Sequence, residues 1–227
     1  MDEMSATNPR PRGSPRSKAG GRGKGAAGAL AHRSPRRLPR GARREQLIDV
    51  AMPLVAEQGL GTFSLDELAR RADVTRNLLY HYFPRGRPDI LLAVAERAGH
   101  LLTDGWVTDE SIPLHERMAA NLQRFLAHSE GPSDAWRIHR LGRASNEPEL
   151  HAIISRFEEV MITGVAQNNF GTPDPPPIAR LAIKGFIAFA EAVLDEARVT
   201  GMSRERVLQL VAQALAATLQ AVRAILR

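Results

Sequence analysis

One short stretch of this sequence concentrates side chains that can form hydrogen bonds with the edges of nucleic acid bases. It spans residues 75–83 and reads Thr-Arg-Asn-Leu-Leu-Tyr-His-Tyr-Phe. An arginine can bond guanine and an asparagine can bond adenine through paired hydrogen bonds, each with about 1 to 3 kcal/mol of discrimination against the wrong base. Arg76 and Asn77 are therefore the expected base readers, unless the arginine is merely solvated. Four neighbours add hydroxyl or imidazole groups that can bond a base or a phosphate: Thr75, Tyr80, His81 and Tyr82.

Other kinds of chemistry find little support in the residue types. The chain has no cysteine, which excludes disulfide bonds, thiolate metal sites and cysteine nucleophiles. The histidines between residues 100 and 151 fall at long, irregular intervals, without the His-Glu-x-x-His spacing of a zinc site. The glycine-rich run at residues 20–25 follows no expected strand, so it is not a phosphate-binding loop. We therefore expect no enzymatic activity, no catalytic residue, no metal and no cofactor.

Two short helices joined by a tight turn must position the base-reading stretch. Ser64 opens the first, over about residues 65–72, in a capping box in which its hydroxyl accepts from the backbone while Glu67 reaches back. Thr75 is a favourable N-cap for the second helix. Asp73 stands in the turn, where a glycine would be easiest, but aspartate tolerates left-handed backbone better than most residues. This arrangement is a helix-turn-helix, and Tyr80 and Tyr82 could equally be packing residues within it.

Helical spacing continues through the rest of the chain. A helix over about residues 42–58 precedes the helix-turn-helix, and Pro53 is expected to kink it. Beyond Pro88 no run alternates in the way typical of a strand. The fold class is therefore all-α, with about nine helices. The later helices are expected at about residues 88–104, 113–129, 133–145, 148–169, 176–200 and 203–226.

Basic charge gathers at the N-terminal end of the chain. Residues 1–44 hold 12 of the 31 Lys and Arg residues but only two of the 25 acidic residues. Residues 1–40 have almost no bulky apolar side chain, so we expect a disordered basic tail, either solvated or serving as an arm that attracts phosphates. Charged residues or prolines interrupt the apolar runs before the roughly 18 residues that span a bilayer. We expect no membrane insertion and a cytoplasmic location.

A longer pattern between about residues 43 and 97 surrounds the helix-turn-helix. Its members are Ile48-Asp49-Val50-Ala51, Leu54, Glu57-Gln58-Gly59, Leu65, Leu68-Ala69, Ala72, Val74-Thr75 and Leu79-Tyr80-His81-Tyr82-Phe83. With these residues the chain resembles the TetR family of bacterial transcriptional regulators. It departs from the family at Asp73 and Asn77, where glycine is common, in residues 84–90, a linker one residue longer than usual, and at Pro53.

The resemblance implies a division of the chain and a function. Residues 1–40 would be the tail, 41–87 the helix-turn-helix DNA-binding domain, and 88–227 a helical effector-binding and dimerization domain. The chain would be a sequence-specific regulator, expected to be a repressor that a small-molecule effector releases from its operator. Helix ends in the family lie against the DNA backbone, which implies phosphate contacts at Arg44, Thr62 and Ser64. Arg85 or Arg87 replaces the phosphate-binding lysine of the family, and we take Arg87 as the candidate.

The last two expected helices are apolar on more than one face, so each must pack against its own core and something else. The family binds double-stranded DNA as a twofold dimer that reads a pseudo-palindrome. We therefore expect a homodimer through these helices; a broader core within one chain is the alternative. Small residues would permit close approach in such a four-helix interface: Ala214, Ala216, Ala217 and Ala221.

Aromatic and polarizable residues with a few polar groups recur between residues 106 and 186. Apolar walls with a few polar anchors are typical of a ligand cavity, and the resemblance places an effector site in this part of the chain. The alternative for each residue is an ordinary core position. The candidate lining residues are Trp106, Met118, Asn121, Phe125, Trp136, His139, Phe157, Met161 and Phe186. The helix over about residues 89–103 is the expected lever between effector and DNA.

A second function remains open. The chain could be a nonspecific or architectural DNA-binding protein that uses the basic tail as its main contact. That function predicts an affinity for duplex DNA that is lost without residues 1–40 and that ignores sequence. The regulator predicts a sequence-specific footprint that survives the loss of the tail.

Overall fold

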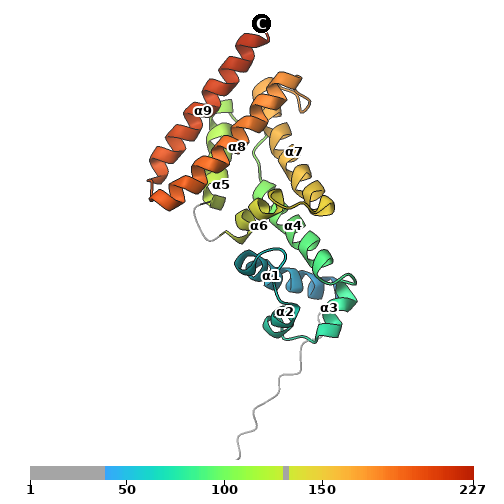
Figure 1. Ribbon diagram of the computed structural model, residues 1–227. Coiled ribbons are helices and arrows are strands. Elements are labelled where there is room, and N and C mark those ends of the chain that lie inside the picture. Colours follow the sequence, from blue (N-terminus) through green and yellow to red (C-terminus); the bar gives the residue numbers. More distant parts are fainter. Residues whose placement is uncertain (1–38, 130–132) are drawn as a thin grey trace, which may run out of the picture. The chain divides into compact units, whose positions relative to one another are not determined.

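The computed structural model describes residues 39–129 and 133–227, which belong to one compact unit. These residues form nine helices and no strand (Figure 1). The all-α prediction is confirmed, and each expected helix is present within a few residues of its expected bounds. The expected basic tail, apart from Pro39 and Arg40, lies outside the described residues. The helices are α1 (Arg40–Gln58), α2 (Leu65–Arg71), α3 (Arg76–Tyr82), α4 (Arg87–Thr103), α5 (Leu114–Ser129), α6 (Asp134–Arg143), α7 (Pro148–Phe170), α8 (Pro177–Thr200) and α9 (Arg204–Ile225).

Helix α1 organises the helix-turn-helix because its inward face is fully buried. Leu47, Leu54 and Val55 are each 0% exposed, and the helix continues through Pro53. A proline inside a helix costs roughly 3 kcal/mol. Burying one such aliphatic side chain contributes about 1.5 to 3 kcal/mol, so the packing of this face can offset that cost.

The core around α1 extends beyond the first three helices. It includes Phe63, Leu68 and Leu79 of the helix-turn-helix region, and it continues into Ile90 of α4 and Ile138 of α6. The first half of α4 and part of α6 therefore share one core with the helix-turn-helix. This core crosses the expected domain boundary after residue 87.

Helices α5 to α9 build the remainder around two further clusters of buried residues. Leu126, Trp136 and Val211 belong to one, and Met161 and Ile183 belong to the other. Helix α8 lies alongside α9, and α4 packs against both α6 and α7 (Figure 1). The elements around α4 thus connect the helix-turn-helix to the larger helical part.

Helix α9 is long and apolar enough to cross a membrane by length and composition alone. Core helices of soluble proteins share this length and composition, so neither property by itself indicates a membrane span. The buried residues of α9 recur at intervals of three or four, at Val207, Val211, Leu215, Leu219 and Val222, as in a helix that packs along one stripe.

Candidate nucleic-acid interface and effector cavity

Helix α3 is anchored to the core by one buried side chain and exposes the side chains of its N-terminal turn. Leu79 is 1% exposed and fixes the helix to the core, while the hydroxyl of Thr75 accepts a hydrogen bond from the backbone N–H of Leu78 at 3.3 Å. Arg76 and Asn77 at the first turn are exposed. The N-cap prediction is confirmed. The helix thus presents the two expected base readers outward from a rigid support.

The remaining predicted residues of α3 differ in exposure. His81 is exposed and Tyr80 is 41% exposed, whereas Tyr82 is half-buried and packs against the core. Tyr82 thus fits the packing alternative better than the other two. Any contact of these side chains with DNA stays a prediction.

The turn before α3 has the geometry that the sequence predicts. Asp73 has a φ of +51°, in the left-handed region that aspartate tolerates. The backbone N–H of Val74 donates to the carbonyl oxygen of Ala69 at 3.0 Å, and the Val74 side chain packs against the core. The sharp turn therefore forms without a glycine.

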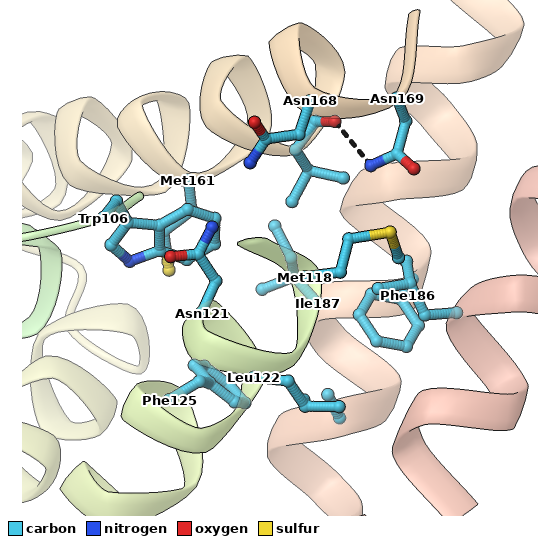
Figure 2. Close-up of a pocket in the computed structure, with 13 residues that line it drawn as sticks. Trp106, Met118, Asn121, Leu122, Phe125, Met161, Asn168, Asn169, Phe186 and Ile187 are labelled. Atoms are coloured by element: carbon cyan, nitrogen blue, oxygen red, sulfur yellow. Dashed lines mark hydrogen bonds between the residues drawn. The ribbon is translucent and has the colours of Figure 1, made fainter. Parts of the chain in front are cut away.

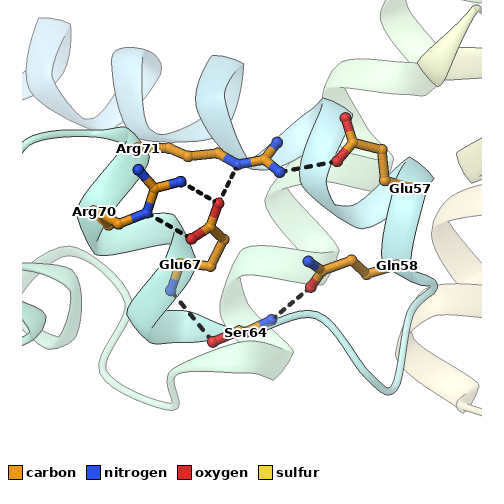
Figure 3. A network of polar contacts seen from close by, with 6 residues as sticks. All are labelled: Glu57, Gln58, Ser64, Glu67, Arg70 and Arg71. Carbon is orange, nitrogen blue, oxygen red and sulfur yellow. Dashed lines mark hydrogen bonds and ion pairs between the residues drawn. The ribbon is translucent and has the colours of Figure 1, made fainter.

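The capping box at the start of α2 is only half realised (Figure 3). The hydroxyl of Ser64 accepts from the backbone N–H of Glu67 at 3.3 Å, as expected. The Glu67 side chain, however, does not reach back to Ser64, because Arg70 and Arg71 hold it; the Ser64 N–H instead donates to Oε1 of Gln58 at 3.0 Å. The reciprocal half of the predicted box is therefore wrong, and Gln58 of α1 takes the role of Glu67.

Glu67 is the acidic centre of a small network on α2. Its carboxylate accepts from Nε of Arg70 and Nε of Arg71, each at 2.8 Å, and Arg71 also reaches Glu57 of α1 at 3.0 Å. Hydrogen bonds from the two guanidinium groups lower the pKa of Glu67 to about 2. The network therefore ties α2 to α1 beside the cap (Figure 3).

Arg76 has a partner, so the solvated alternative does not describe it fully. Its Nη1 lies 3.0 Å from Oδ1 of Asp66, and both side chains are largely exposed. The neighbouring Tyr80 hydroxyl and the Asp66 carboxylate raise the pKa of Arg76. Exposed pairs of this kind contribute about 0 to 1 kcal/mol, so exchanging Asp66 for a base edge would cost little.

The predicted phosphate contacts lie at helix ends. The Arg44 guanidinium lies over the ring of Phe83 at 5.4 Å from its centroid. Thr62 is exposed, and its hydroxyl bonds the carbonyl oxygen of Gln58; Ser64 is half-buried at its cap. Arginine and hydroxyl side chains are the groups that commonly bond DNA phosphates, and these contacts stay predictions.

The geometry distinguishes the two arginines of the α3–α4 linker. Arg85 pairs with Asp89 at 2.6 Å and with Glu149 at 3.0 Å, so two carboxylates oppose its charge. Arg87 instead donates from Nε to the carbonyl oxygen of Phe63 at 2.9 Å and lies over that ring. Phe63 stands between Thr62 and Ser64 in the sequence. Arg87 therefore fits the phosphate role better than Arg85.

Gly86 permits this linker to turn. Its φ is +70°, and a Cβ at this position would lie 3.1 Å from Cε1 of Tyr80. Any other residue would be strained in backbone and would push against a ring of the recognition helix. The close packing of the linker against Tyr80 of α3 therefore requires glycine at position 86.

A cavity of about 50 Å³ lies between α5, α7 and α8 (Figure 2). Six of the nine predicted lining residues surround it: Trp106, Met118, Asn121, Phe125, Met161 and Phe186. Drug-sized ligand pockets are usually about 300 to 1,000 Å³, so a ligand of that size requires the walls to move.

The other three predicted residues do not line this cavity. Phe157 packs against Gly99 of α4, where an added methyl group would clash with its ring. Trp136 is 2% exposed and meets the ring of Phe125 edge-on at 5.4 Å. His139 is 1% exposed, with Nε2 3.3 Å from Oε1 of Glu191. All three are occupied by contacts between helices instead.

Sequence reasoning missed two polar residues of the cavity, Asn168 and Asn169 near the end of α7. Three adjacent amides, Gln167, Asn168 and Asn169, close to Gly171 were the available signal. The further lining residues are aliphatic and resemble any core position: Leu122, Val165, Ile187, Ala190 and Leu215. Among the described residues, no group of three or more acidic or histidine side chains is placed to hold a metal.

Comparisons with known proteins agree with this architecture. Residues 47–94 match the family model described as bacterial regulatory proteins, tetR family. The transcriptional activator FasR of Mycolicibacterium smegmatis is 29% identical over 135 residues, which are 57% of this chain and 59% of FasR. The chain therefore covers less than two thirds of that relative's length.

Solved structures extend the likeness to the larger helical part. A tetR-family transcriptional regulator from Streptomyces coelicolor has a TM-score of 0.69 and 25% identity, over 84% of this chain and 85% of that one. FadR from Bacillus subtilis, solved in complex with stearoyl-CoA, has a TM-score of 0.61 and 16% identity, over 77% of this chain and 97% of that one. Residues 47–94, which contain the helix-turn-helix, therefore belong to the TetR family of bacterial regulatory proteins, and the remaining helices share the fold of its solved members.

Proposed function

We propose that this protein is a sequence-specific transcriptional regulator that binds a pseudo-palindromic DNA operator as a homodimer. The observation that carries the proposal is helix α3, capped by Thr75, anchored by Leu79, and exposing Arg76 and Asn77. A helix offered in this way fits the major groove of B-form DNA. Arg44, Thr62, Ser64 and Arg87 would fix its register through phosphates.

The unpaired faces of α8 and α9 support the dimer. Leu181 of α8 is 69% exposed and Leu210 of α9 is 48% exposed, although both helices are apolar. Ala217 and Ala221 are exposed on the same face of α9 as Leu210, and Ala216 is exposed on another face. Large exposed apolar surface rarely persists on a monomer. A second copy of the chain covers these faces in our proposal, and two copies of α3 then read two half-sites.

The cavity between α5, α7 and α8 is the proposed effector site. FadR, which shares the fold, was solved with stearoyl-CoA, so a fold of this kind accommodates a small molecule. An effector acts only through its different affinities for the DNA-binding and released conformations. We propose that the protein is a repressor which the effector releases, acting in the cytoplasm and without enzymatic activity. FasR is named an activator, so the sign of regulation needs its own measurement.

A footprinting experiment with the full chain tests the regulator. The purified protein is incubated with DNA flanking its own gene, and we expect protection of a pseudo-palindromic site that survives competition by excess scrambled duplex. A reporter gene behind a promoter that contains this site then distinguishes repression from activation. A repressor lowers reporter expression when the protein is present. Protection without sequence preference would contradict the proposal.

The basic charge of residues 1–44 supports the second candidate, an architectural or nonspecific DNA-binding protein. Replacing the Lys and Arg residues of positions 1–38 by Gln in the full chain separates the two. A regulator keeps its footprint, with a smaller dependence of affinity on salt, because fewer phosphates are neutralised. An architectural protein loses its affinity for all duplexes.

A further inference from the structure

The hydrogen-bond partners of Asn168 and Asn169 fix the orientation of their side-chain amides. Nδ2 of Asn168 lies 3.0 Å from the carbonyl oxygen of Val107, and Nδ2 of Asn169 lies 2.9 Å from that of Val165. A carbonyl oxygen only accepts hydrogen bonds, so the nitrogen must occupy that end of each amide. The other end of each amide is therefore an oxygen, which is an acceptor.

These two acceptors are buried, and neither has a hydrogen-bond partner among the described residues. Oδ1 of Asn168 and Oδ1 of Asn169 both meet this description, and Asn168 as a whole is 6% exposed. Both residues line the cavity (Figure 2). A buried acceptor without a donor is unfavourable, so the two oxygens favour an occupant that supplies an N–H or O–H group.

Asn121, the third asparagine of the cavity, does not add a donor. Its Oδ1 accepts from the N–H of Val107 at 2.8 Å and its Nδ2 donates to the carbonyl oxygen of Val107 at 3.0 Å. The amide of Asn121 thus clamps the α4–α5 connection with both ends. Among the three asparagines of the cavity, only the two on α7 therefore leave a buried side-chain acceptor without a partner.

The cavity also carries no formal charge. Its described lining consists of the three asparagines and apolar or aromatic side chains such as Trp106, Phe125 and Phe186, without Asp, Glu, Lys or Arg (Figure 2). An ion placed there would lose its hydration without a counter-charge. The lining therefore disfavours both anions and cations.

We infer that the effector is a neutral, largely apolar molecule whose N–H or O–H group donates a hydrogen bond to Asn168 or Asn169. Alcohols, phenols and indole-like rings have this chemistry. The inference rests on the proposed function, because it assigns the cavity to the effector. The small volume of the cavity means that a ring-sized effector enters by moving the side chains of α5, α7 and α8, which makes binding sensitive to their arrangement.

Three single-ring probes that differ in one group test the inference on the full-length protein. 4-Fluorophenol is neutral and donates, 4-fluoroanisole is neutral and lacks the donor, and 4-fluorobenzylamine is a cation at neutral pH. Fluorine NMR titration measures the affinity of each without DNA. We expect 4-fluorophenol to bind about 3- to 10-fold more tightly than 4-fluoroanisole, the effect of one hydrogen bond, and 4-fluorobenzylamine to bind most weakly.

Two variants assign the preference to the asparagines. In Asn169→Ala the carbonyl oxygen of Val165 remains within the hydrogen-bond ladder of α7, so the helix should fold. Asn168→Ala removes the other acceptor. We expect at least one of the two variants to reduce the preference for 4-fluorophenol over 4-fluoroanisole, with circular dichroism confirming the fold. Asn146→Ala is the matched control, because Asn146 is exposed between α6 and α7, outside the cavity lining.

Several results would overturn the inference: equal affinities for the phenol and the anisole, tightest binding of the amine, binding of none of the probes, or a preference that neither asparagine variant changes. Footprinting on the same preparation separates this failure from failure of the proposed function. A sequence-specific footprint without the donor preference overturns the effector class alone. An asparagine-dependent preference without any footprint supports the chemistry of the cavity and contradicts the regulator.

Discussion

Arg76 is the side chain on which sequence discrimination by α3 most depends. It is exposed at the first turn, stays charged, and is paired only weakly with Asp66. We expect Arg76→Ala to weaken operator binding by about 1 to 3 kcal/mol per half-site, or roughly 5- to 150-fold, if the arginine bonds a guanine. Fluorescence anisotropy on operator and scrambled duplexes at one salt concentration measures both affinities.

A matched variant makes this result specific to α3. Arg137→Ala removes an exposed arginine of α6 and should leave operator binding nearly unchanged. Equal losses on operator and scrambled duplex in Arg76→Ala would show that Arg76 contacts a phosphate and reads no base.

Single residues differ in how well the sequence predicts them. The N-cap of Thr75 and the left-handed Asp73 follow from local chemistry, so sequence sufficed for both. The replacement of Glu67 by Gln58 at the cap of α2 did not follow, because it depends on how α1 ends beside α2. Likewise, only the packing between α7 and the α4–α5 connection shows that two asparagine oxygens lack partners while the amide of Asn121 is fully used.

At the scale of elements, the network of Glu67, Arg70 and Arg71 on α2 makes stability depend on pH. The pKa of Glu67 is about 2 in the folded protein, below the ordinary value of 4.5. Since the folded pKa is lowered, the unfolded chain binds more protons between these values, and stability falls as the pH decreases from about 4.5 towards 2. We expect Glu67→Gln to be less stable at neutral pH and to lose less stability over this acid range. Urea denaturation followed by circular dichroism at several pH values measures both effects.

Glu116→Gln is the control for this prediction, because Glu116 is an exposed glutamate on α5 outside the network. The Glu116→Gln protein should lose as much stability between about pH 4.5 and pH 2 as the unaltered protein does. If Glu67→Gln and the unaltered protein lose the same stability over this pH range, Arg70 and Arg71 do not stabilise the fold through Glu67.

The helices were predictable because the spacing of apolar residues marks each helix and local residues such as glycine mark where it ends. Nine expected helices match nine observed ones, and Gly59, Gly171 and Gly201 follow the ends of three of them with positive φ. The faces that helices share were harder to predict. Trp136, His139 and Phe157 were expected in the cavity, yet they serve the contacts of α6 and α7 with neighbouring helices. Periodicity identifies a buried face but not the element that covers it.

At the scale of the molecule, contacts connect the cavity with the helix-turn-helix through α6. Phe125 of the cavity wall meets Trp136 of α6, and Trp136 stacks on His139 at 6.1 Å. His139 pairs with Glu191 of α8, and the other side of α6 packs against α1 and α4. Contacts therefore run from the cavity wall through α6 to α1, beside the route through α4 expected from the sequence.

The assembly offers the sharpest test of the whole molecule. Ala217 is exposed on α9, and close approach of two such helices leaves little room for a carboxylate, so we expect Ala217→Glu to convert the proposed dimer into monomers. Light scattering after size-exclusion chromatography measures the mass, and anisotropy should show loss of affinity for the full operator while half-site affinity persists. Ala119→Glu, exposed on α5, should stay dimeric. An Ala217→Glu protein that remains a dimer would place the interface elsewhere, and the exposed stripe of α9 would then need another partner.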